Sequence, residues 1–405
     1  MFFQSQLEMN NIPQGYKQTE LGIIPLDWEL CTFKDVLATF SSGATPYRGI
    51  PEYYNGDVRW ISSGELNYNH IYDTLEHISQ QAVRNTNLRI HKPGTFLMAI
   101  TGLEAEGTRG RCAFVGAPSA TNQSCLAING TDKMCTEYLF WFYRMWGQYL
   151  AFKYCQGTKQ QSYTADIVKK LPIYGPKDIA EQRAIAEALS DVDGLIAALD
   201  KKIAKKRLLK QGAMQQLLTG KKRLPGFTDE WVEKKLESIA DIYQPQTISQ
   251  EEFSIDGYDV YGANGVIGKY HLYNHTTEQV MVTCRGSSCG TVNMSAGKCW
   301  ITGNAMILNM DKYDVSKIFI YYYLLNQDLS ELITGSGQPQ IVRTPLSEYV
   351  VKIPFDRIEQ QAIATILSDM DKEIADLEAQ RDKYRLLKSG MMQKLLTGQI
   401  RLKRE

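Results

Sequence analysis

The chain has 405 residues, of which 43% are hydrophobic, so it can form packed cores for two or three domains. Its 45 basic and 45 acidic residues cancel, whereas a protein that binds DNA without partners is usually basic overall. The zero net charge argues against a lone DNA binder, but it is compatible with one member of a complex or with a chain whose charges are segregated.

The sequence also gives an expectation for the compartment. The N-terminal segment has no basic start followed by an apolar run, and no stretch reaches the roughly 18 apolar residues of a membrane helix. Eight cysteines in a chain of this length favour reduced thiols over a disulfide scaffold. We therefore expect a soluble, cytoplasmic protein.

Residues 1–177 are predicted to form an N-terminal segment followed by a β-rich domain with a helix or two. A Gly-Ala-Thr-Pro turn lies at 43–46, and a short aromatic run at 139–146 indicates a buried helix or strand. Short strands are expected at three places: 56–61, 95–100 and 112–115.

A long helix is predicted at 178–220. Asp178 and Glu181 form an Asp-x-x-Glu pattern, in which the first carboxylate accepts from free backbone amides and the second reaches back. Gly220 suits a left-handed helix end. Between these ends, apolar residues recur in steps of 4, 3, 4, 3 and 4, as in a coiled-coil seam: Ile185, Leu189, Val192, Ile196, Leu199 and Ile203. About forty residues at a rise of about 1.5 Å make a rod about 60 Å long.

Residues 221–355 are predicted to form a second β-rich domain. A hairpin-type turn signal lies at 259–265, and strands are expected at 279–283 and 300–307. An apolar run at 318–325 again indicates a buried helix or strand.

Residues 356–405 are predicted to form a second long helix and a C-terminal tail. Laying 178–224 over 356–402 gives a constant offset of 178 (356 minus 178) and 27 identities in 47 positions, whereas chance gives about three. The seam is matched by Ile363, Leu367, Met370, Ile374, Leu377 and Arg381. An amphipathic helix on a domain surface is the alternative, but the length and the repetition favour a coiled coil. We therefore expect an α+β fold with a pseudo-twofold repeat, in which two long antiparallel coiled-coil α-helices separate two β-rich domains.

Two glycines, Gly212 and Gly390, lie at equivalent positions inside the predicted helices. Each costs roughly 1 kcal/mol relative to Ala in a helix interior. We expect a close helix crossing to require them.

Enzyme motifs are missing from the sequence. It has no Gly-x-x-x-x-Gly-Lys-Ser/Thr loop, no His-Glu-x-x-His zinc site and no Gly-x-Ser-x-Gly elbow. It has no Pro-Pro pair, which excludes the Asn-Pro-Pro-aromatic motif of amino-methyltransferases, and no Pro-Asp pair, the usual opening of a restriction-nuclease site. We expect no catalytic residues.

Cysteine chemistry offers two weaker alternatives. One is a zinc site formed by Cys284, Cys289 and Cys299 with His271 or His275. The irregular spacing favours small buried thiols instead, so we expect no metal. The other alternative is a nucleophile at Cys125 or Cys155 paired with a histidine, but the residues flanking them do not suggest activation.

Polar side chains suited to DNA base edges cluster in predicted turns. Arg and Lys form bidentate hydrogen bonds with guanine, and Asn and Gln do so with adenine. The first domain offers Thr45, Tyr47, Arg48, Arg59, Arg109, Arg111, Lys159, Gln160 and Gln161. The second offers Tyr261, Asn264, Arg285, Asn304, Gln338, Gln340 and Arg343. Each of them taken singly is also compatible with a solvated loop residue or a turn former.

The stretch 201–223 contains nine basic residues and no acidic one. Such a stretch suits the phosphate backbone or an acidic face of a partner. A solvated helix face explains it equally well.

These segments together resemble the specificity subunits of type I restriction-modification systems. The resemblance covers essentially the whole chain, with the module order domain, helix, domain, helix. It lies in the opening at 15–28, in 42–46 and 60–66 of the first domain, in 261–268, 283–286 and 301–305 of the second, and in the two Glu-Gln...Leu-Leu-Thr-Gly helical segments.

The resemblance implies that each β-rich domain is a target recognition domain for one half of a bipartite site in double-stranded DNA. Two rigidly spaced domains require half-sites a fixed distance apart, and two dissimilar domains predict a site that is not palindromic. The helices would set the gap and dock two methyltransferase subunits, which methylate adenine. Motor-nuclease restriction subunits would join for cleavage.

S-adenosylmethionine, Mg and ATP are then expected in the partner subunits and not in this chain. The helix residues expected at the partner-binding surface are Ile185, Leu189, Leu199, Leu208, Leu209, Ile363, Leu367, Leu377, Leu386 and Leu387. Two other functions remain open. One is the recognition subunit of a type IIB-like restriction enzyme, and the other is a coiled-coil scaffold whose β-rich domains bind protein or sugar.

Overall fold

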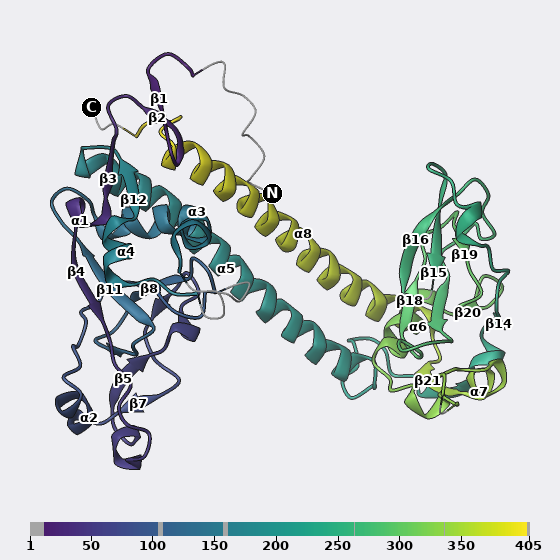
Figure 1. Cartoon of the computed structure of the whole chain (residues 1–405). Helices are drawn as coiled ribbons and strands as arrows, with labels where there is room; N and C mark the ends of the chain where they lie inside the picture. The colour runs from purple at the N-terminus through teal and green to yellow at the C-terminus, as the bar shows by residue number, and fades with distance from the viewer. Residues whose placement is uncertain (1–11, 104–107, 157–160, 263, 336, 403–405) are drawn as a thin grey trace. The chain divides into compact units, whose positions relative to one another are not determined.

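The computed structural model describes residues 12–103, 108–156, 161–262, 264–335 and 337–402. The chain divides into two compact units: unit 1 is Met1–Ala198 with Arg381–Glu405, and unit 2 is Leu199–Gln380. Two long helices, α5 (Ile179–Leu217) and α8 (Arg357–Leu396), contribute residues to both units (Figure 1). Each unit therefore combines one β-rich domain with a part of each long helix.

The main sheet of unit 1 has five strands in the order β4-β11-β8-β9-β6. Strands β8 and β9 read Phe-Leu-Met-Ala and Cys-Ala-Phe-Val, and every residue in them is buried, as expected for strands covered on both faces. Helix α3 (Thr136–Tyr154) packs beside this sheet (Figure 1) and contains the predicted aromatic run. The strand bounds are β4 (Leu37–Ser42), β6 (His70–Ile71), β8 (Phe96–Ala99), β9 (Cys112–Val115) and β11 (Cys125–Gly130).

A smaller lobe of unit 1 contains a three-stranded sheet in the order β10-β5-β7. Its core surrounds Trp60, which is 2% exposed. The lobe contains β5 (Val58–Ile61), β7 (His77–Ile78), β10 (Ala120–Thr121), α2 (Gln80–Asn85) and the short turns η1 (Pro51–Tyr54) and η2 (Ser63–Glu65). The rest of unit 1 contains β1 (Tyr16–Thr19), β2 (Gly22–Pro25), β3 (Glu29–Thr32), α1 (Phe33–Val36), α4 (Ala165–Lys170) and β12 (Pro172–Gly175).

Unit 2 has a four-stranded sheet, β14-β20-β17-β18, and a three-stranded sheet, β16-β15-β19. Helix α6 (Lys317–Leu325) covers the first sheet and contains the second predicted apolar run. The sheet strands are β14 (Asp241–Tyr243), β15 (Tyr258–Gly262), β16 (Gly265–Tyr270), β17 (Val280–Thr283), β18 (Val292–Met294), β19 (Trp300–Ile301) and β20 (Ala305–Asn309). The remaining elements are β13 (Trp231–Lys235), β21 (Val350–Pro354), α7 (Arg343–Glu348), η3 (Leu236–Ser238), η4 (Gln250–Glu252) and η5 (Ser330–Leu332).

One predicted strand is wrong in its length. The run at 300–307 forms two strands, β19 and β20, separated by a turn at 302–304. The turn arises because β19 pairs in parallel with β15, whereas β20 pairs antiparallel with β17 in the other sheet. The apolar residues are continuous along the run, but the chain passes from one sheet to the other.

The two units share one order of elements. The sheet β4-β11-β8-β9 of unit 1 corresponds to β14-β20-β17-β18 of unit 2, and β10-β5-β7 corresponds to β19-β15-β16. The pair β12-β3 likewise corresponds to β21-β13. The repeat seen in the helical sequences therefore extends through both β-rich domains, where the sequences barely match.

The helix starts confirm one part of the predicted capping and correct the other. The Oδ1 of Asp178 accepts from the backbone amide of Ala180 at 2.8 Å, and that of Asp356 accepts from Ile358 at 2.7 Å. The second carboxylates, Glu181 and Glu359, are 2% and 1% exposed and do not reach back to the helix start. They form buried ion pairs instead.

Each buried glutamate pairs with an arginine that follows the end of a long helix. Arg401 holds Glu181 through Nε at 2.6 Å and Nη2 at 2.7 Å, and it also donates to Asp27 at 2.9 Å. In unit 2, Arg223 holds Glu359 at 2.6 and 2.7 Å. Because Arg401 and Arg223 are 178 positions apart, as are the two glutamates, the same joint is built twice.

The neighbouring glutamine fixes each helix start to its own domain. The Oε1 of Gln182 accepts from the amide of Cys135 at 2.9 Å, and its Nε2 donates to the carbonyl of Pro176 at 2.8 Å. Gln360 accepts from Ser316 at 2.9 Å and donates to Pro354 at 2.8 Å. Both amides are almost fully buried, and these bonds supply their polar partners.

The predicted helix seam is largely buried. Five of its residues are at most 8% exposed in α5 and four are in α8: Ile185, Leu189, Ile196, Leu199, Ile203, Ile363, Leu367, Ile374 and Leu377. Six of the ten residues predicted to bind a partner are in this group, so they pack inside the chain and are not accessible: Ile185, Leu189, Leu199, Ile363, Leu367 and Leu377. The other four are exposed: Leu208 at 69%, Leu209 at 51%, Leu386 at 77% and Leu387 at 49%.

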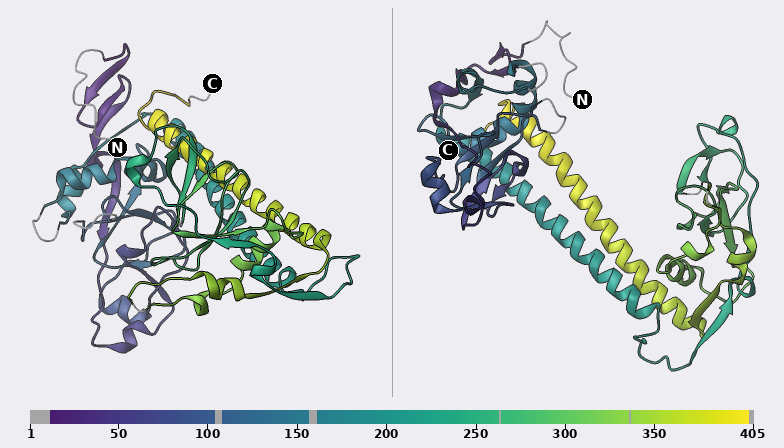
Figure 2. Two further views of the ribbon diagram at one scale, coloured as in Figure 1. Left: turned by 90° about the vertical axis from the view of Figure 1, so that its right-hand side faces the viewer. Right: turned by 60° about the horizontal axis from the view of Figure 1, so that its bottom comes forward.

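Ion pairs connect the helices within each unit. In unit 1, Asp193 contacts Lys388 and accepts from Arg144 at 2.9 Å. Burial alone would raise the pKa of Asp193, but these two cations lower it below its usual value. The counterpart in unit 2 is Lys210 with Asp371, at 2.5 Å. Figure 2 shows the C-terminal part of α8 in yellow beside the start of α5 in teal.

The expected role of the helix glycines is wrong for this chain. A Cβ built on Gly212 or Gly390 would meet no described atom within 4 Å beyond its own helical turn. Neither position is a close helix crossing within the chain. By contrast, Gly220 and Gly398 have φ of 68° and 71°, the left-handed conformation predicted for Gly220 as a helix end.

Among the described residues, no helix combines the length and the apolar character needed to cross a membrane.

Arg401→Ala is expected to lower the free energy of unfolding by about 3 kcal/mol, because it leaves the buried carboxylate of Glu181 without its cation. Urea denaturation followed by circular dichroism measures the change. Lys177→Ala is the matched control, since its ion pair with Glu29 is exposed and should contribute less than about 1 kcal/mol. Equal losses in the two variants would show that the buried pair does not stabilise the joint.

Candidate nucleic-acid interface

Three of the predicted base-contacting residues in unit 2 line one hollow of about 300 Å³: Arg285, Gln340 and Arg343. Tyr243 and Gln244, which the sequence analysis did not single out, also line it. The lining residues that the structure describes include two guanidinium groups and no carboxylate. The hollow therefore suits a ligand that presents hydrogen-bond acceptors or negative charge.

Backbone hydrogen bonds hold the loops that form this hollow. Arg285 follows β17, and its backbone forms an isolated β-bridge with Gln340. Next to the bridge, the amide of Ile341 donates to the carbonyl of Cys284 at 3.0 Å. Arg343 is the first residue of α7. These contacts place two exposed arginines and one glutamine from separate segments around the same opening.

Gln244 is another residue that lines this hollow. It follows β14, and its Nε2 donates to the carbonyl of Gly303 at 3.2 Å and to the sulfur of Cys284 at 3.0 Å. Both bonds use the amide nitrogen of the side chain. Sequence spacing does not predict this position, because about forty residues separate Gln244 from Arg285.

Two predicted asparagines lie on the adjoining turns. The Nδ2 of Asn264, at the tip of the β15-β16 hairpin, donates to the hydroxyl of Ser288 at 2.7 Å. Asn304 is exposed, and its carbonyl accepts from the amide of Cys284 at 3.1 Å. The turn that contains Arg285 is thus held from both sides.

The two remaining predicted residues of unit 2, Gln338 and Tyr261, differ in their exposure. Gln338 is exposed on the loop before Gln340. Tyr261 is half-buried, and its hydroxyl accepts from the amide of Ala296 at 3.1 Å, so this hydroxyl has a structural contact in the fold.

In unit 1, the predicted arginine Arg48 is already engaged. Its guanidinium donates to both carboxylate oxygens of Glu76, at 2.5 and 2.8 Å, and lies 4.3 Å from the ring centre of Tyr54. The bond to Glu76 raises the pKa of Arg48. Arg59 lies 3.5 Å from Asp73. Both arginines have acidic partners within the domain, which makes them weaker candidates for base contacts than Arg285.

Two neighbouring residues of unit 1 are more accessible. Tyr47 is 73% exposed. The hydroxyl of Thr45 contacts the side-chain oxygen of Gln123, which the sequence analysis did not single out. These two side chains leave hydrogen-bonding groups on the surface of the first domain.

A second cluster in unit 1 surrounds Arg109. Its Nε donates to the carbonyl of Leu103 at 2.6 Å, and its Nη2 lies 3.4 Å from the Oε1 of Gln161. Its guanidinium is 6.0 Å from the ring of the exposed Phe152. Arg111 is half-buried nearby in the chain. Lys159 and Gln160 were also predicted, and they lie outside the described residues.

The hollow of unit 2 has a counterpart frame in unit 1. The amide of Tyr163 donates to the carbonyl of Ile100 at 2.8 Å, matching the bond from Ile341 to Cys284, and Thr101 bridges Ser162 as Arg285 bridges Gln340. The matched positions carry different side chains, here given as unit 1 with unit 2: Thr101 with Arg285, Ser124 with Asn304, Ser162 with Gln340, and Ala165 with Arg343. Two similar frames therefore present different chemistry.

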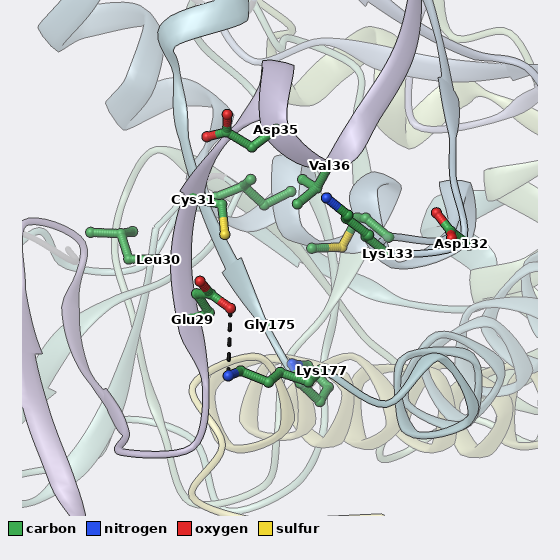
Figure 3. A pocket seen from close by; sticks show the side chains of 12 residues that line it. Glu29, Leu30, Cys31, Asp35, Val36, Asp132, Lys133, Gly175 and Lys177 are labelled. Carbon is green, nitrogen blue, oxygen red and sulfur yellow. Dashed lines mark ion pairs between the residues drawn. The ribbon is translucent and has the colours of Figure 1, made fainter.

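A further hollow in unit 1, of about 420 Å³, lies away from the predicted residues (Figure 3). Its charged lining is mixed, and Lys177 forms an ion pair with Glu29 at 3.6 Å. Burial, with help from Glu29 and Asp35, raises the pKa of Cys31 in its wall. This direction is the opposite of what an activated thiol nucleophile needs.

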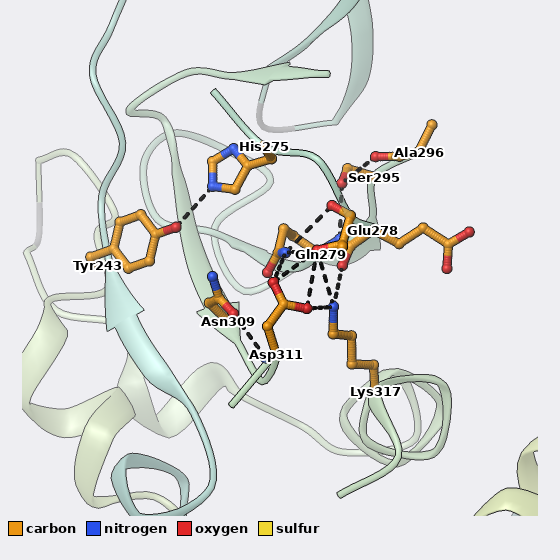
Figure 4. A network of polar contacts seen from close by, with 10 residues as sticks. Tyr243, His275, Glu278, Gln279, Ser295, Ala296, Asn309, Asp311 and Lys317 are labelled. Atoms are coloured by element: carbon orange, nitrogen blue, oxygen red, sulfur yellow. Dashed lines mark hydrogen bonds and ion pairs between the residues drawn. The ribbon is translucent and has the colours of Figure 1, made fainter. Parts of the chain in front are cut away.

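Tyr243, which lines the hollow of unit 2, also takes part in polar contacts within this unit (Figure 4). Tyr243 hydrogen-bonds to the Nε2 of His275 at 2.8 Å, and the other ring nitrogen lies 2.6 Å from the Oδ1 of Asn274. Burial lowers the pKa of His275, which favours the neutral ring, and both ring nitrogens have a hydrogen-bond partner. The network fixes Tyr243 at the edge of the hollow.

The zinc alternative finds no support in the described residues. No group of three His, Cys, Asp or Glu side chains in the described ranges is arranged to hold a metal ion. Cys284 is buried and accepts a hydrogen bond from Gln244. The carboxylate of Asp311 forms an ion pair with Lys317. Burial raises the pKa of Asp311, but the hydrogen bonds from Lys317 and Thr277 lower it overall.

Comparisons with known proteins find type I specificity subunits that match over most of the chain. The putative type I restriction enzyme MjaX specificity subunit of Methanocaldococcus jannaschii is 26% identical, over 96% of this chain and 97% of its own length. The type I restriction enzyme EcoprrI specificity subunit of Escherichia coli is 25% identical, over 82% of this chain and 84% of its own.

A solved structure shares the fold. The crystal structure of the type I restriction-modification S subunit from M. genitalium matches with a TM-score of 0.67 at 17% identity, covering 91% of this chain and 96% of that one. The family model for the type I restriction modification DNA specificity domain matches this chain twice, at residues 25–206 and 228–384. The chain therefore belongs to the family of type I restriction-modification specificity subunits.

Proposed function

We propose that this chain reads the DNA sequence for a type I restriction-modification complex, with each unit contacting one half of a bipartite site. The main support is the convergence of Arg285, Gln340 and Arg343 around one exposed hollow that has no acidic lining residue among those described. Two guanidinium groups and an amide are the groups that form bidentate bonds with base edges in the major groove.

The two half-sites differ in this proposal. Unit 2 offers arginines, which favour guanine, and the amides of Gln340 and Asn264, which favour adenine. At the matched positions of unit 1, hydroxyl groups of Thr101 and Ser162 replace the longer side chains. Since the chemistry differs at equivalent positions, the full site is asymmetric.

We assign α5 and α8 the role of an antiparallel coiled-coil spacer that fixes the distance between half-sites. The buried seam with its 4-and-3 spacing and the ion pairs between the helices within each unit support this role. Two methyltransferase subunits dock on the outer surface of these helices. Six of the ten predicted docking residues are buried, so the docking surface in this proposal contains the four exposed ones: Leu208, Leu209, Leu386 and Leu387.

Catalysis belongs to the partner subunits in this proposal. S-adenosylmethionine is bound by the methyltransferase subunits, and Mg and ATP by the motor-nuclease subunits. Burial is the largest cause of the raised pKa values of the Cys125 and Cys155 thiols, which argues against a nucleophile at either position. The chain contributes recognition and positioning, and it acts in the cytoplasm where these partners meet DNA.

Two experiments separate this proposal from its alternatives. Methylated adenines mapped in cells with and without the gene should reveal a split motif with a constant gap that disappears with the gene. Binding of the assembled complex to DNA should depend on sequence and fall steeply with salt. A scaffold for protein or sugar would show neither behaviour, and a type IIB-like enzyme would copurify with one fused nuclease-methyltransferase chain.

Arg285→Ala is expected to relax recognition at a single base pair in one half-site and to weaken binding roughly tenfold, since a bidentate contact contributes about 1 to 3 kcal/mol. Competition binding with a library of single-base variants of the site measures both effects. Arg357→Ala is the matched control, because this exposed arginine of unit 2 pairs with Asp314 and does not line the hollow. An equal loss of discrimination at both half-sites would contradict the assignment.

Leu199→Asp combined with Leu377→Asp is expected to disrupt the helix seam and release methyltransferase subunits. Both leucines are less than 9% exposed, and each replacement should cost at least about 2 kcal/mol. Gel filtration of the assembled complex measures the release. Leu195→Asp is the control, because Leu195 is 40% exposed on the same helix and lies off the seam. A complex that stays intact with the double variant would rule out docking that depends on the seam.

A further inference from the structure

The side-chain amide of Gln244 has one favoured orientation in the hollow of unit 2. Its Nε2 has two hydrogens to donate, and two acceptors lie within reach: the carbonyl of Gly303 at 3.2 Å and the sulfur of Cys284 at 3.0 Å. The opposite orientation would bring the amide oxygen up to the carbonyl oxygen of Gly303, and neither of these oxygens can donate. The amide nitrogen therefore faces the protein.

The thiol of Cys284 agrees with this orientation. Its sulfur lies 3.2 Å from the carbonyl oxygen of Asn304, which can only accept, so the thiol hydrogen points there. The sulfur then offers a lone pair to the amide of Gln244. All the hydrogens in this small network have a partner, and the network leaves the amide oxygen of Gln244 unused.

This amide oxygen is open to a ligand. Gln244 is exposed and lines the hollow, and its Oε1 accepts no hydrogen bond from the residues that the structure describes. Arg285 and Arg343 line the same hollow, and their guanidinium groups can only donate. Gln244 therefore adds a fixed acceptor beside these donors, and the ligand group that meets it must be a donor.

We propose that Gln244 is a specificity-determining residue that reads an exocyclic amino group on the major-groove edge of a base, either N4 of cytosine or N6 of adenine. This inference rests on the proposed function and names the chemical group that one residue recognises. A glutamine with both ends of its amide available reads adenine, with its oxygen at N6 and its nitrogen at N7. Gln244 has only its oxygen to offer.

The same oxygen disfavours the competing bases. Thymine carries O4 where cytosine carries N4, and guanine carries O6 where adenine carries N6. An acceptor that faces an acceptor leaves both groups without a hydrogen bond, which destabilises the wrong complex. In a G·C pair, guanine presents two acceptors and cytosine one amino group. Arginine donors together with the oxygen of Gln244 complement that edge, which favours cytosine over adenine.

Only one half-site should depend on this amide. The position of unit 1 that matches Cys284 is Ile100, because Tyr163 donates to Ile100 as Ile341 donates to Cys284. Isoleucine has no polar side-chain atom, so the sulfur that orients Gln244 has no counterpart in unit 1.

The experiment combines a protein variant with the removal of one amino group from the DNA. Gln244→Met removes both polar atoms of the amide at nearly constant size, and the variant should fold because the side chain is exposed. Circular dichroism checks the fold. In the DNA, 2-pyrimidinone replaces each cytosine in turn and unsubstituted purine replaces each adenine in turn, throughout the site mapped by methylation.

Binding of the assembled complex to each duplex is then measured by competition. With the unmodified chain, loss of the amino group at one position should weaken binding about tenfold, because the oxygen of Gln244 loses its donor. Gln244→Met should weaken binding to the natural site by a similar factor, and the same base change should then have little further effect. A response to 2-pyrimidinone assigns N4 of cytosine, and a response to purine assigns N6 of adenine.

Gln246→Met is the matched control. Gln246 is exposed in the same segment after β14, and it is not among the described residues that line the hollow. This variant should bind the natural site like the unmodified chain, and it should respond in the same way to loss of the amino group.

Three outcomes would overturn the inference. The first is unchanged binding and base preference in Gln244→Met. The second is a set of losses that multiply at every position, which would mean that Gln244 only supports the fold of the hollow. The third is an equal effect of Gln246→Met. The proposed function would fail separately, if the complex with the unmodified chain showed no sequence-selective binding.

Discussion

The buried pairing of Glu181 with Arg401, repeated as Glu359 with Arg223, is the contact on which the architecture depends. Each pair joins the beginning of one long helix to the segment that follows the end of the other. A carboxylate that is 1% or 2% exposed requires its cation, because an unpaired charge at that depth is strongly unfavourable. The glutamines beside them join the same helix starts to the β-rich domains by hydrogen bonds within each unit.

The sequence predicted the long helices well, because repetition and spacing are local signals. It misassigned contacts that depend on tertiary structure. Glu181 was read as a capping residue, since Asp-x-x-Glu has that pattern, but the partner that claims it lies 220 positions away. Gly390 was expected at a helix crossing, and its surroundings are open. The run at 300–307 was read as one strand, although its residues divide between two sheets.

The sequence predicted which types of side chain the candidate interface contains better than it predicted which residues come together there. Arg285, Gln340 and Arg343 were chosen because their side chains suit base edges, and the fold brings them to one hollow. Gln244 was missed because only the pairing of β14 with β20 brings it beside them. Arg48 has the right chemistry but is occupied by Glu76. The positions of unit 1 that match the hollow became visible only through equivalent backbone hydrogen bonds, which a sequence does not reveal.

The division of the chain between the units has a consequence for biosynthesis. Unit 2 is one continuous stretch, Leu199–Gln380, so its fold can be completed while later residues are still being added. Unit 1 needs Arg381 and the residues after it, which the ribosome supplies only after the whole of unit 2. The domain that is translated first is therefore the one whose fold is completed last. Until Arg401 has been synthesised, the carboxylate of Glu181 lacks the cation with which it pairs in the finished fold.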